Sequence, residues 1–329
     1  LPAFGKLAAQ DGRHLLWQIG RADHSAAEFA LGPAQFRDFL KNDFGFEDRF
    51  FIAGYSDPRQ EFPYVLPGPA DTWGGTWATA GWRTHQINIL FELAGVTPDS
   101  DFTLSVNLLD FAKSFLPKVK ISINGQDQTY QLSTPEHAPE TQRNYLYKEP
   151  IRDTLSITGH LQTATPRVLE IPVRRGELKS GGNRIMLTVL EGSWILFDEL
   201  HLTGPAQASV IRPGQLFLRD VSAAGYELAQ GKRKCQPLIV DAQWLSGRPE
   251  IGVELDGREI YRKVIDAGRN QLEVPMPAVK RQTRSRYPIT ENGREIAAGT
   301  VVRTPQPLQT PADYVDTRIG TAHSRWMKS

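Results

Sequence analysis

Three tryptophans, an arginine and a histidine crowd into one short segment that is rich in glycine and proline. Trp73, Trp77 and Trp82 come first, and Arg83 and His85 come directly after them. A flat indole face packs well against the apolar C–H side of a sugar ring, while Arg and His supply directional hydrogen bonds to hydroxyls or carboxylates. Loops on a rigid β-scaffold often carry such sites. These five residues are our candidate carbohydrate-binding residues. The alternative is that the tryptophans plug one end of a sandwich and fix a long loop.

Three carboxylates form a second candidate group. Asp23 and Glu28 stand in GRADHSAAEF, and Asp198 interrupts the apolar run WILFDEL. A pair of carboxylates can perform acid–base chemistry, or hold a structural calcium ion together with backbone carbonyls. Nothing in their spacing brings the three together in space, and the sequence has no D-x-D-x-D-G calcium loop. Helix capping and structural hydrogen bonding are therefore the favoured interpretation, and the presence of a metal stays open.

The usual catalytic signatures are missing. The sequence has no G-x-S-x-G elbow, no H-E-x-x-H zinc helix, no Walker loop and no G-x-G-x-x-G after a predicted strand. Its seven histidines are scattered without metal-ligand spacing, so each is expected to be a surface or hydrogen-bonded residue. The single cysteine, Cys235, excludes an internal disulfide and is expected to be buried. We therefore predict no catalytic residue and no cofactor, apart from the calcium ion that the carboxylates could hold.

Composition narrows the class of protein. The 329 residues carry a formal net charge of +1. This balance argues against nucleic acid or an anionic membrane surface as a partner, because either would need a concentrated positive field. No stretch approaches the ~20 apolar residues of a membrane-spanning helix. The sequence begins at Leu1 rather than at methionine, which a removed signal peptide or trimming would explain. A secreted or periplasmic location is compatible with this start.

The elements that must position these residues are predicted to be strands. Short apolar or alternating runs are separated by Gly, Pro, Asn and Asp, a pattern typical of an antiparallel sandwich or barrel. Asn124-Gly125 and Asp256-Gly257 are strong hairpin signals. Helical patterns are scarce. The predicted strands of the first part are Leu15–Ile19, Gln86–Leu93, Phe102–Leu108, Val119–Ile123, Val168–Val173, Arg184–Leu190 and Trp194–Leu202.

A domain boundary is expected near Gly204-Pro205, where the last of these runs ends. We assign 1–205 to a jelly-roll β-sandwich and 206–303 to a smaller immunoglobulin-like β-sandwich, because about a hundred residues of short strands lie beyond the boundary. Residues 304–329 are assigned to a linker and a short C-terminal segment, since TPQPLQTP carries three prolines in eight residues. The fold class predicted for the whole chain is all-β.

Two segments resemble known families. LLWQIGRADHSAAEF, FFIAGYSDPRQEFPYVLPGPADTW, HQINILFEL and the closing GSWILFDELHLTGP resemble the carbohydrate-binding-like jelly roll of family 4 polysaccharide lyases, the rhamnogalacturonan lyases. This resemblance spans about residues 10 to 205. In those lyases the catalytic residues lie in a separate N-terminal domain, so the resemblance implies a binding or scaffolding module and no lyase activity.

The second resemblance is shorter. YVDTRIGT, Tyr314–Thr321, looks like the opening of glycoside hydrolase family 92, the calcium-dependent exo-α-mannosidases, and it comes directly after the Pro-rich linker. None of that family's catalytic carboxylates or calcium ligands can be placed on the residues present here. The resemblance implies that the chain is the accessory part of a larger bacterial glycoside hydrolase, ending in the truncated start of its catalytic domain.

Three hypotheses therefore stand. The leading one is a non-catalytic accessory region that binds a poly- or oligosaccharide and is joined to a downstream catalytic domain. The second is a polysaccharide lyase or glycoside hydrolase whose unrecognised active site uses Trp73, Trp77, Arg83, His85 and a carboxylate. The third is a purely structural spacer that fixes the orientation of a neighbouring domain. The first and the third share every sequence feature, so only ligand affinity separates them.

Overall fold

The chain forms two compact units, Leu1–Arg212 and Pro213–Ser329. The computed structural model describes residues 13–35, 38, 48–71, 85–134, 146–147, 151–155, 161–231 and 233–308. The first unit ends a few residues beyond Pro205, because strand β14, Ser209–Ile211, returns to pair with β4, Gln86–Ala94. Within the described ranges no helix is long and apolar enough to cross a membrane.

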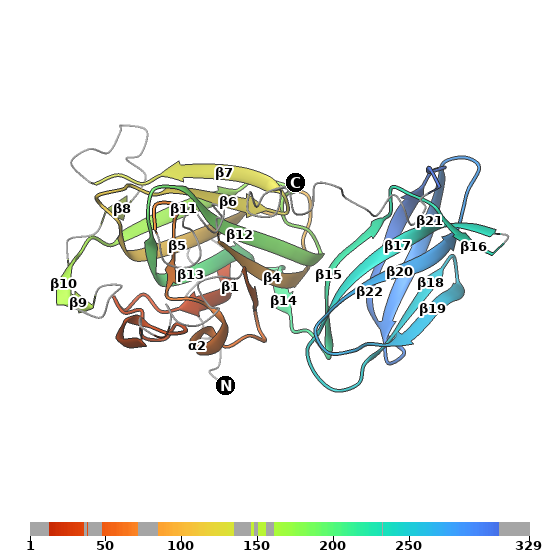
Figure 1. Ribbon diagram of the computed structural model, residues 1–329, viewed down its shortest axis with the longest axis horizontal. Coiled ribbons are helices and arrows are strands. Elements are labelled where there is room, and N and C mark those ends of the chain that lie inside the picture. The colour runs from red at the N-terminus through yellow and green to blue at the C-terminus, as the bar shows by residue number, and fades with distance from the viewer. Residues whose placement is uncertain are drawn as a thin grey trace, which may run out of the picture. The chain divides into compact units, whose positions relative to one another are not determined.

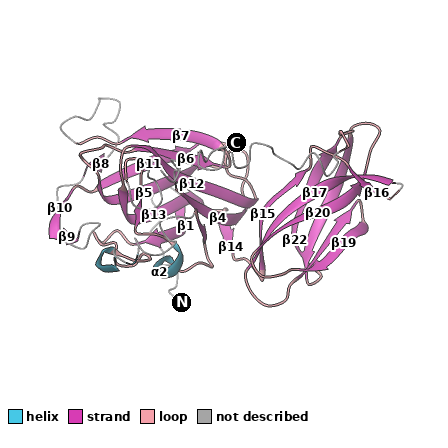
Figure 2. Ribbon diagram, viewed as in Figure 1, coloured by secondary structure: helices cyan, strands magenta, loops and turns pink. Residues whose placement is uncertain are grey.

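Both units are built almost entirely from strands, as Figures 1 and 2 show. In the first unit, two sheets share a single hydrophobic core. Its first sheet has the order β1-β13-β5-β11-β8, and β3 pairs with β13. These strands are β1 Arg13–Gly20, β13 Ile195–Pro205, β5 Phe102–Phe111, β11 Arg167–Val173, β8 Leu146–Tyr147 and β3 Val65–Leu66.

The second sheet of the first unit has the order β14-β4-β12-β6-β7, and β2 pairs with β4 in parallel. Its remaining strands are β12 Gly181–Glu191, β6 Lys118–Ile123, β7 Gln126–Gln131 and β2 Arg49–Ile52. A separate hairpin joins β9 Ile151–Leu155 and β10 Leu161–Ala164. The described helical segments are the one-turn helix α2, Pro58–Glu61, and a 3-10 turn at Pro33–Gln35.

Alternation along the strands explains the core. Successive side chains of a strand point to opposite faces, so every second residue of β5 and of β4 reaches the interior. Trp17 of β1 is 1% exposed and packs against Phe91 of β4 with ring centroids 5.5 Å apart, which ties the two sheets together. The prediction of an all-β sandwich over the first part of the chain is confirmed.

The second unit is a smaller sandwich of two four-stranded sheets around its own core. In one sheet β17 pairs with β15, β16 and β20; the other has the order β19-β18-β21-β22. The strands are β15 Leu216–Ala223, β16 Leu228–Gln230, β17 Arg233–Trp244, β20 Arg269–Pro277, β18 Glu250–Leu255, β19 Arg258–Val264, β21 Thr283–Glu291 and β22 Arg294–Arg303. Cys235 of β17 is buried, as predicted.

Two-residue turns set the register of the hairpins. Asn124 and Gly125 have φ values of 49° and 88° and connect β6 to β7. Asp256 and Gly257 do the same between β18 and β19, with 51° and 81°. Positive φ at both central positions is the geometry that matches the twist of the flanking strands, and it is why Asn-Gly and Asp-Gly occupy these turns.

Candidate functional site

The predicted tryptophan site lies largely outside the described residues. Trp73, Trp77, Trp82 and Arg83 all fall in the segment 72–84, so their role as carbohydrate-binding residues stays a prediction. His85 is the one candidate that the structure describes. It is 4% exposed, directly before strand β4, so its ring is held in the protein rather than offered to solvent.

The residue before the tryptophan segment is also buried. Asp71 is 7% exposed, and its carboxylate accepts hydrogen bonds from the Ser193 hydroxyl at 2.5 Å and the Gly68 backbone N–H at 2.8 Å. Burial raises the pKa of Asp71, and the two hydrogen bonds oppose this by lowering it. Two buried polar side chains therefore flank the segment that carries the tryptophans: Asp71 directly before it and His85 directly after it.

The structure brings the three candidate carboxylates near one another. One oxygen of Asp198, which is 1% exposed, accepts hydrogen bonds from the backbone N–H groups of His24 at 2.9 Å and Ser25 at 3.2 Å. Glu28 accepts from the Arg21 N–H at 2.8 Å. Burial raises the pKa of Glu28, a backbone hydrogen bond lowers it, and the charges of Asp23 and Asp198 raise it further. The favoured interpretation, structural hydrogen bonding to a backbone turn, describes Asp198 and Glu28.

A β-bulge explains how Asp198 reaches this turn. The pairing of β13 with β5 shifts between Phe197 and Glu199, so Asp198 is an extra residue opposite β5. Strict alternation would point Asp198 into the core, because Leu200 and Leu202 face inward. The bulge instead lets the strand turn Asp198 toward the loop, while Glu199 keeps the outward position that alternation with Leu200 gives it. Bulges re-aim side chains in this way near functional sites.

Polar side chains gather on the outer face of the first sheet, across the four strands β1, β13, β5 and β11. One line of paired residues runs from Gln18 through His201 and Ser105 to Glu170. The next line pairs Gly20 with Glu199 and Glu199 with Asn107. These strands are neighbours in one sheet, in the order β1-β13-β5-β11, and all four are labelled in Figure 1. We call six of these residues the polar patch: Gln18, Ser105, Asn107, Glu170, Glu199 and His201.

Hydrogen bonds link four residues of the polar patch, Ser105, Asn107, Glu170 and Glu199, and His201 lies beside them. The Ser105 hydroxyl donates to Glu170 at 2.7 Å, and the Asn107 amide donates to Oε2 of Glu199 at 2.5 Å. The Nδ1 atom of His201 lies 3.3 Å from the same Glu199 oxygen. The middle of the network is buried, with Ser105 at 1% and Asn107 and Glu199 both at 6% exposure. Its ends are accessible: Glu170 is exposed, and Gln18 and His201 are half-buried.

This arrangement suits the recognition of a polar, uncharged surface such as that of a sugar. Carboxylates, amides, hydroxyls and an imidazole offer both donors and acceptors, and the buried members fix the orientation of the accessible ones. A sheet is also a more rigid platform than a loop. The six side chains include no Trp, Tyr or Phe, so the polar patch by itself offers a ligand hydrogen bonds and no aromatic ring for stacking.

Sequence reasoning missed the polar patch. It gave His201 no role in a site, and the structure places this half-buried side chain beside the buried Glu199. The signal was present in the strands FTLSVNL and ELHL, where polar residues alternate with apolar ones. Alternation of this kind identifies one sheet face as polar but does not tell which strands will lie next to each other. Pairing of β5 with β13, distant in sequence, was needed to bring Asn107 to Glu199.

A small pocket lies at another position on the first unit. Its volume is about 250 Å³, and it is lined by His14, Leu15, Leu16, Gly54, Ser209, Val210 and Arg212. These residues come from β1, from β14 and its neighbour in the chain, and from the turn after β2. Pockets for drug-sized ligands usually measure about 300 to 1,000 Å³, so this one has room for a small group only.

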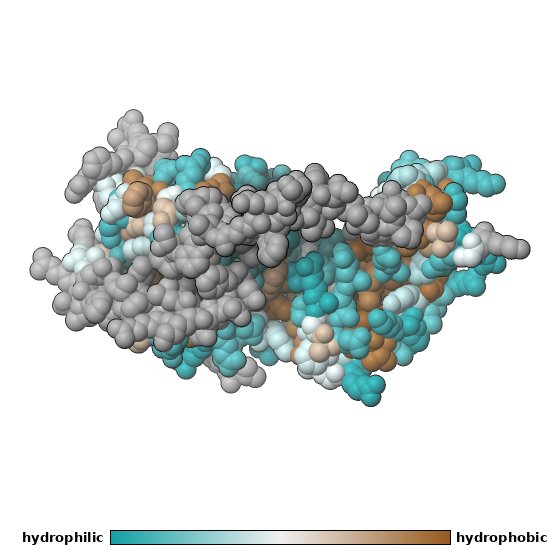
Figure 3. Space-filling view, in the orientation of Figure 1, coloured by the Kyte–Doolittle hydropathy of each residue, from teal (hydrophilic) through white to brown (hydrophobic). Residues whose placement is uncertain are grey.

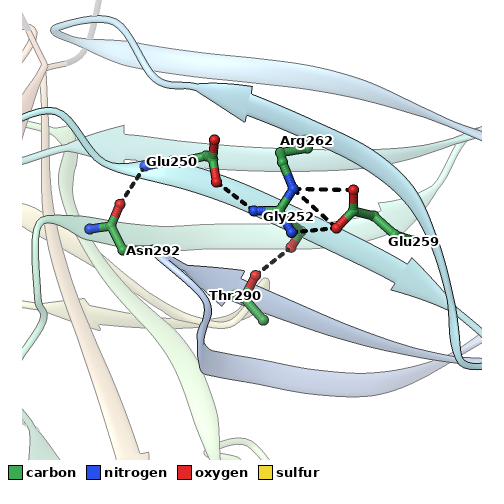
Figure 4. Close-up of polar contacts among 6 residues, drawn as sticks. All are labelled: Glu250, Gly252, Glu259, Arg262, Thr290 and Asn292. Carbon is green, nitrogen blue, oxygen red and sulfur yellow. Dashed lines mark hydrogen bonds and ion pairs between the residues drawn. The ribbon is translucent and has the colours of Figure 1, made fainter.

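One charged cluster on the second unit is paired internally. Figure 4 shows Arg262 of β19 between two carboxylates: its Nε lies 3.1 Å from each oxygen of Glu259, and its Nη1 lies 2.5 Å from Glu250. These ion pairs raise the pKa of Arg262 and lower that of Glu259. Figure 3 shows teal and brown residues mixed over the visible face of this unit. Because its N–H groups already bond to Glu259 and Glu250, we assign Arg262 a structural role on the sheet surface rather than a role in ligand binding.

Metal binding finds no support in the part of the chain that the structure describes. There, no group of three or more His, Cys, Asp or Glu side chains is arranged to hold a metal ion. Asp23, Glu28 and Asp198 are close enough for their charges to interact. However, Glu28 and Asp198 each use a carboxylate oxygen to accept hydrogen bonds from backbone N–H groups.

Most of the first unit matches a known protein family. Residues 15–202 fit the model of the family described as CBM-like, polysaccharide lyase family 4, domain III. A rhamnogalacturonate lyase of Dickeya dadantii (strain 3937) is 27% identical over an alignment of 211 residues, which covers 62% of this chain and 30% of that enzyme. This chain therefore matches less than one third of the length of that relative. The first resemblance predicted from sequence is confirmed over these residues.

The second resemblance is not supported by these matches. It rests on Tyr314–Thr321, which lie outside the described residues and beyond the matched range, so the link to glycoside hydrolase family 92 stays a prediction.

Two solved structures are distantly similar to this chain. A β-D-mannosidase from Dictyoglomus thermophilum is 9% identical, with a TM-score of 0.22, over 65% of this chain and 28% of that one. A GH2 β-galacturonidase from Eisenbergiella tayi is also 9% identical, with a TM-score of 0.22, over 74% of this chain and 38% of that one. Scores of this size give no basis for comparing sites.

Proposed function

Because this chain belongs to the CBM-like family of polysaccharide lyase family 4, domain III, we propose that its first unit is a non-catalytic module that binds carbohydrate through the polar patch. The observation that carries the proposal is the network from Glu170 to His201, in which buried side chains orient accessible donors and acceptors. Hydrogen-bond networks of this kind recognise hydroxyl groups, because each hydroxyl both donates and accepts.

The proposal extends to the role of the whole chain. The first unit binds a poly- or oligosaccharide, the second unit acts as a spacer, and the region serves a bacterial glycan-degrading enzyme that is secreted or periplasmic. A second sandwich with internally satisfied ion pairs supports a spacer role for that unit. Holding a polymer near a catalytic domain raises the effective concentration of substrate without any chemistry by the module itself.

Calorimetric titration of the full chain with neutral and acidic oligosaccharides tests the proposal. At least one oligosaccharide should bind, and the double variant Gln18→Ala/His201→Ala should bind it about 5- to 150-fold more weakly, because two hydrogen bonds are worth roughly 1 to 3 kcal/mol together. Gln126→Ala, on the exposed edge strand β7 of the other sheet, is the matched control. Absence of binding to every oligosaccharide in the panel would leave the structural spacer as the remaining function.

One observation favours a second function. The Nδ1 atom of His201 lies 3.3 Å from Glu199, and an imidazole oriented by a carboxylate can abstract a proton. On a uronate polymer this step would start a β-elimination, which leaves an unsaturated product that absorbs in the ultraviolet. A time-dependent rise in that absorbance, lost in His201→Ala, would establish lyase activity; a flat trace across uronate polymers would exclude it for this site.

A further inference from the structure

The charges of the polar patch distinguish between classes of sugar. Glu170 and Glu199 are both carboxylates, and His201 is the only member of the patch that can become positively charged. Each carboxylate already accepts one hydrogen bond from a side chain, Glu170 from Ser105 and Glu199 from Asn107. Among the described residues, no side chain donates a hydrogen bond to the second oxygen of either group. The patch therefore presents acceptors that call for donors on the ligand.

Sugar hydroxyls are donors, whereas the carboxylate of a uronate only accepts. A uronate carboxylate placed about 5 Å from Glu170 or Glu199 would also be repelled. That repulsion weakens binding about 4-fold at the dielectric of water, and on the order of 100-fold at the dielectric typical of a protein surface. Glu199 is only 6% exposed, so a uronate that reached the middle of the network would meet the stronger repulsion, the one estimated at the dielectric of a protein surface.

We propose that the polar patch binds neutral sugar residues through their hydroxyl groups and discriminates against uronates. This inference rests on the proposed function and adds the class of ligand to it. Glu170 is the selective residue at the accessible end, since it is exposed and lies on the outer strand of the four that carry the patch. Glu199 acts from the buried middle, where the Asn107 amide holds it with a hydrogen bond and His201 lies beside it.

The experiment compares neutral oligosaccharides, of galactose, mannose or rhamnose, with an oligogalacturonate of the same length. Calorimetric titration of the full chain at neutral pH and about 0.15 M salt should give at least about 10-fold tighter binding for the best neutral ligand. The preference should grow when the salt concentration is lowered, because screening weakens repulsion between the carboxylates.

A variant that removes one charge tests whether the preference for neutral sugars comes from the polar patch. Glu170→Gln keeps an oxygen to accept from Ser105 but removes the charge, and the ratio of neutral to uronate affinity should fall by about 5-fold or more. Glu191→Gln, on the other sheet and with its side chain 65% exposed, is the matched control and should leave the ratio unchanged.

Two results would overturn the inference and leave the proposed function standing. One is oligogalacturonate binding that equals or exceeds neutral binding, and the other is an unchanged affinity ratio in Glu170→Gln. Binding of neither ligand would remove the proposed function itself, and the inference with it.

Discussion

Replacing Asp198 tests how the first unit holds the loop beside the polar patch. A single oxygen of this carboxylate accepts from the N–H groups of His24 and Ser25, and the side chain is 1% exposed. Asp198→Ala leaves two backbone donors without this partner, at a cost of roughly 1 to 3 kcal/mol each. We expect a loss of about 4 kcal/mol in the free energy of unfolding of the first unit. For a unit of about 200 residues this lowers Tm by about 8 to 16 °C.

Two further variants make the test specific. Asp198→Asn keeps an oxygen in the same place, so we expect a loss of only about 1 kcal/mol. Asp127→Ala on the exposed strand β7 removes a surface partner of Lys120 and should change Tm little.

Scanning calorimetry of the full chain supplies the measurement, and the transition of the second unit serves as an internal reference. A loss below about 1 kcal/mol for Asp198→Ala would refute the reasoning, as would equal losses for the Ala and Asn variants. The Ala variant should also bind carbohydrate more weakly, because Glu199 is the residue directly after the bulge.

The remaining predictions concern pH and packing. The folded-state pKa of Glu28 is raised, so the stability it contributes is present below its unfolded pKa of about 4.5 and is lost as pH rises through the folded value. Glu28→Gln should therefore raise the Tm of the first unit at pH 7 by calorimetry, and the difference from wild type should vanish below about pH 4. In the second unit, a Cβ at Gly252 would lie 2.6 Å from the Thr290 hydroxyl. Gly252→Ala should cost about 1 to 3 kcal/mol in urea unfolding, and a Thr290→Ala background should recover most of it.

Strand positions were predictable because the signal is local. Each run of apolar or alternating residues identified in the first part of the sequence coincides with a strand of the structure to within a few residues at its ends. Asn124-Gly125 and Asp256-Gly257 form the turns expected of them. Asn292-Gly293 between β21 and β22 is a turn of the same kind, with φ values of 49° and 81°, and the same signal would have identified it.

The candidate site was harder to predict because it depends on pairing between distant segments. Asn107 and Glu199 are 92 residues apart in the sequence, yet their side chains share a hydrogen bond. Periodicity tells that each lies on the polar face of its strand. It does not tell that β13 lies between β1 and β5, which is the order that assembles the polar patch. The tryptophan segment could be identified because its residues are close together along the chain. Residues that come close only in the folded protein cannot be recognised in this way.

The bulge in β13 links the two groups of carboxylates that sequence alone could not relate. Without an extra residue, Asp198 and Glu199 would face opposite sides of the sheet, and one of them would have to enter the hydrophobic core as an unpaired charge. With it, Asp198 binds the backbone of the loop while Glu199 joins the polar patch. Gly20 completes the arrangement: it pairs with Glu199 at φ +78°, and a Cβ there would lie 2.6 Å from the Asp198 carbonyl oxygen. The loop that leaves β1 can therefore approach Asp198 only because this position is glycine, and the geometry of the patch depends on a backbone irregularity as much as on its own side chains.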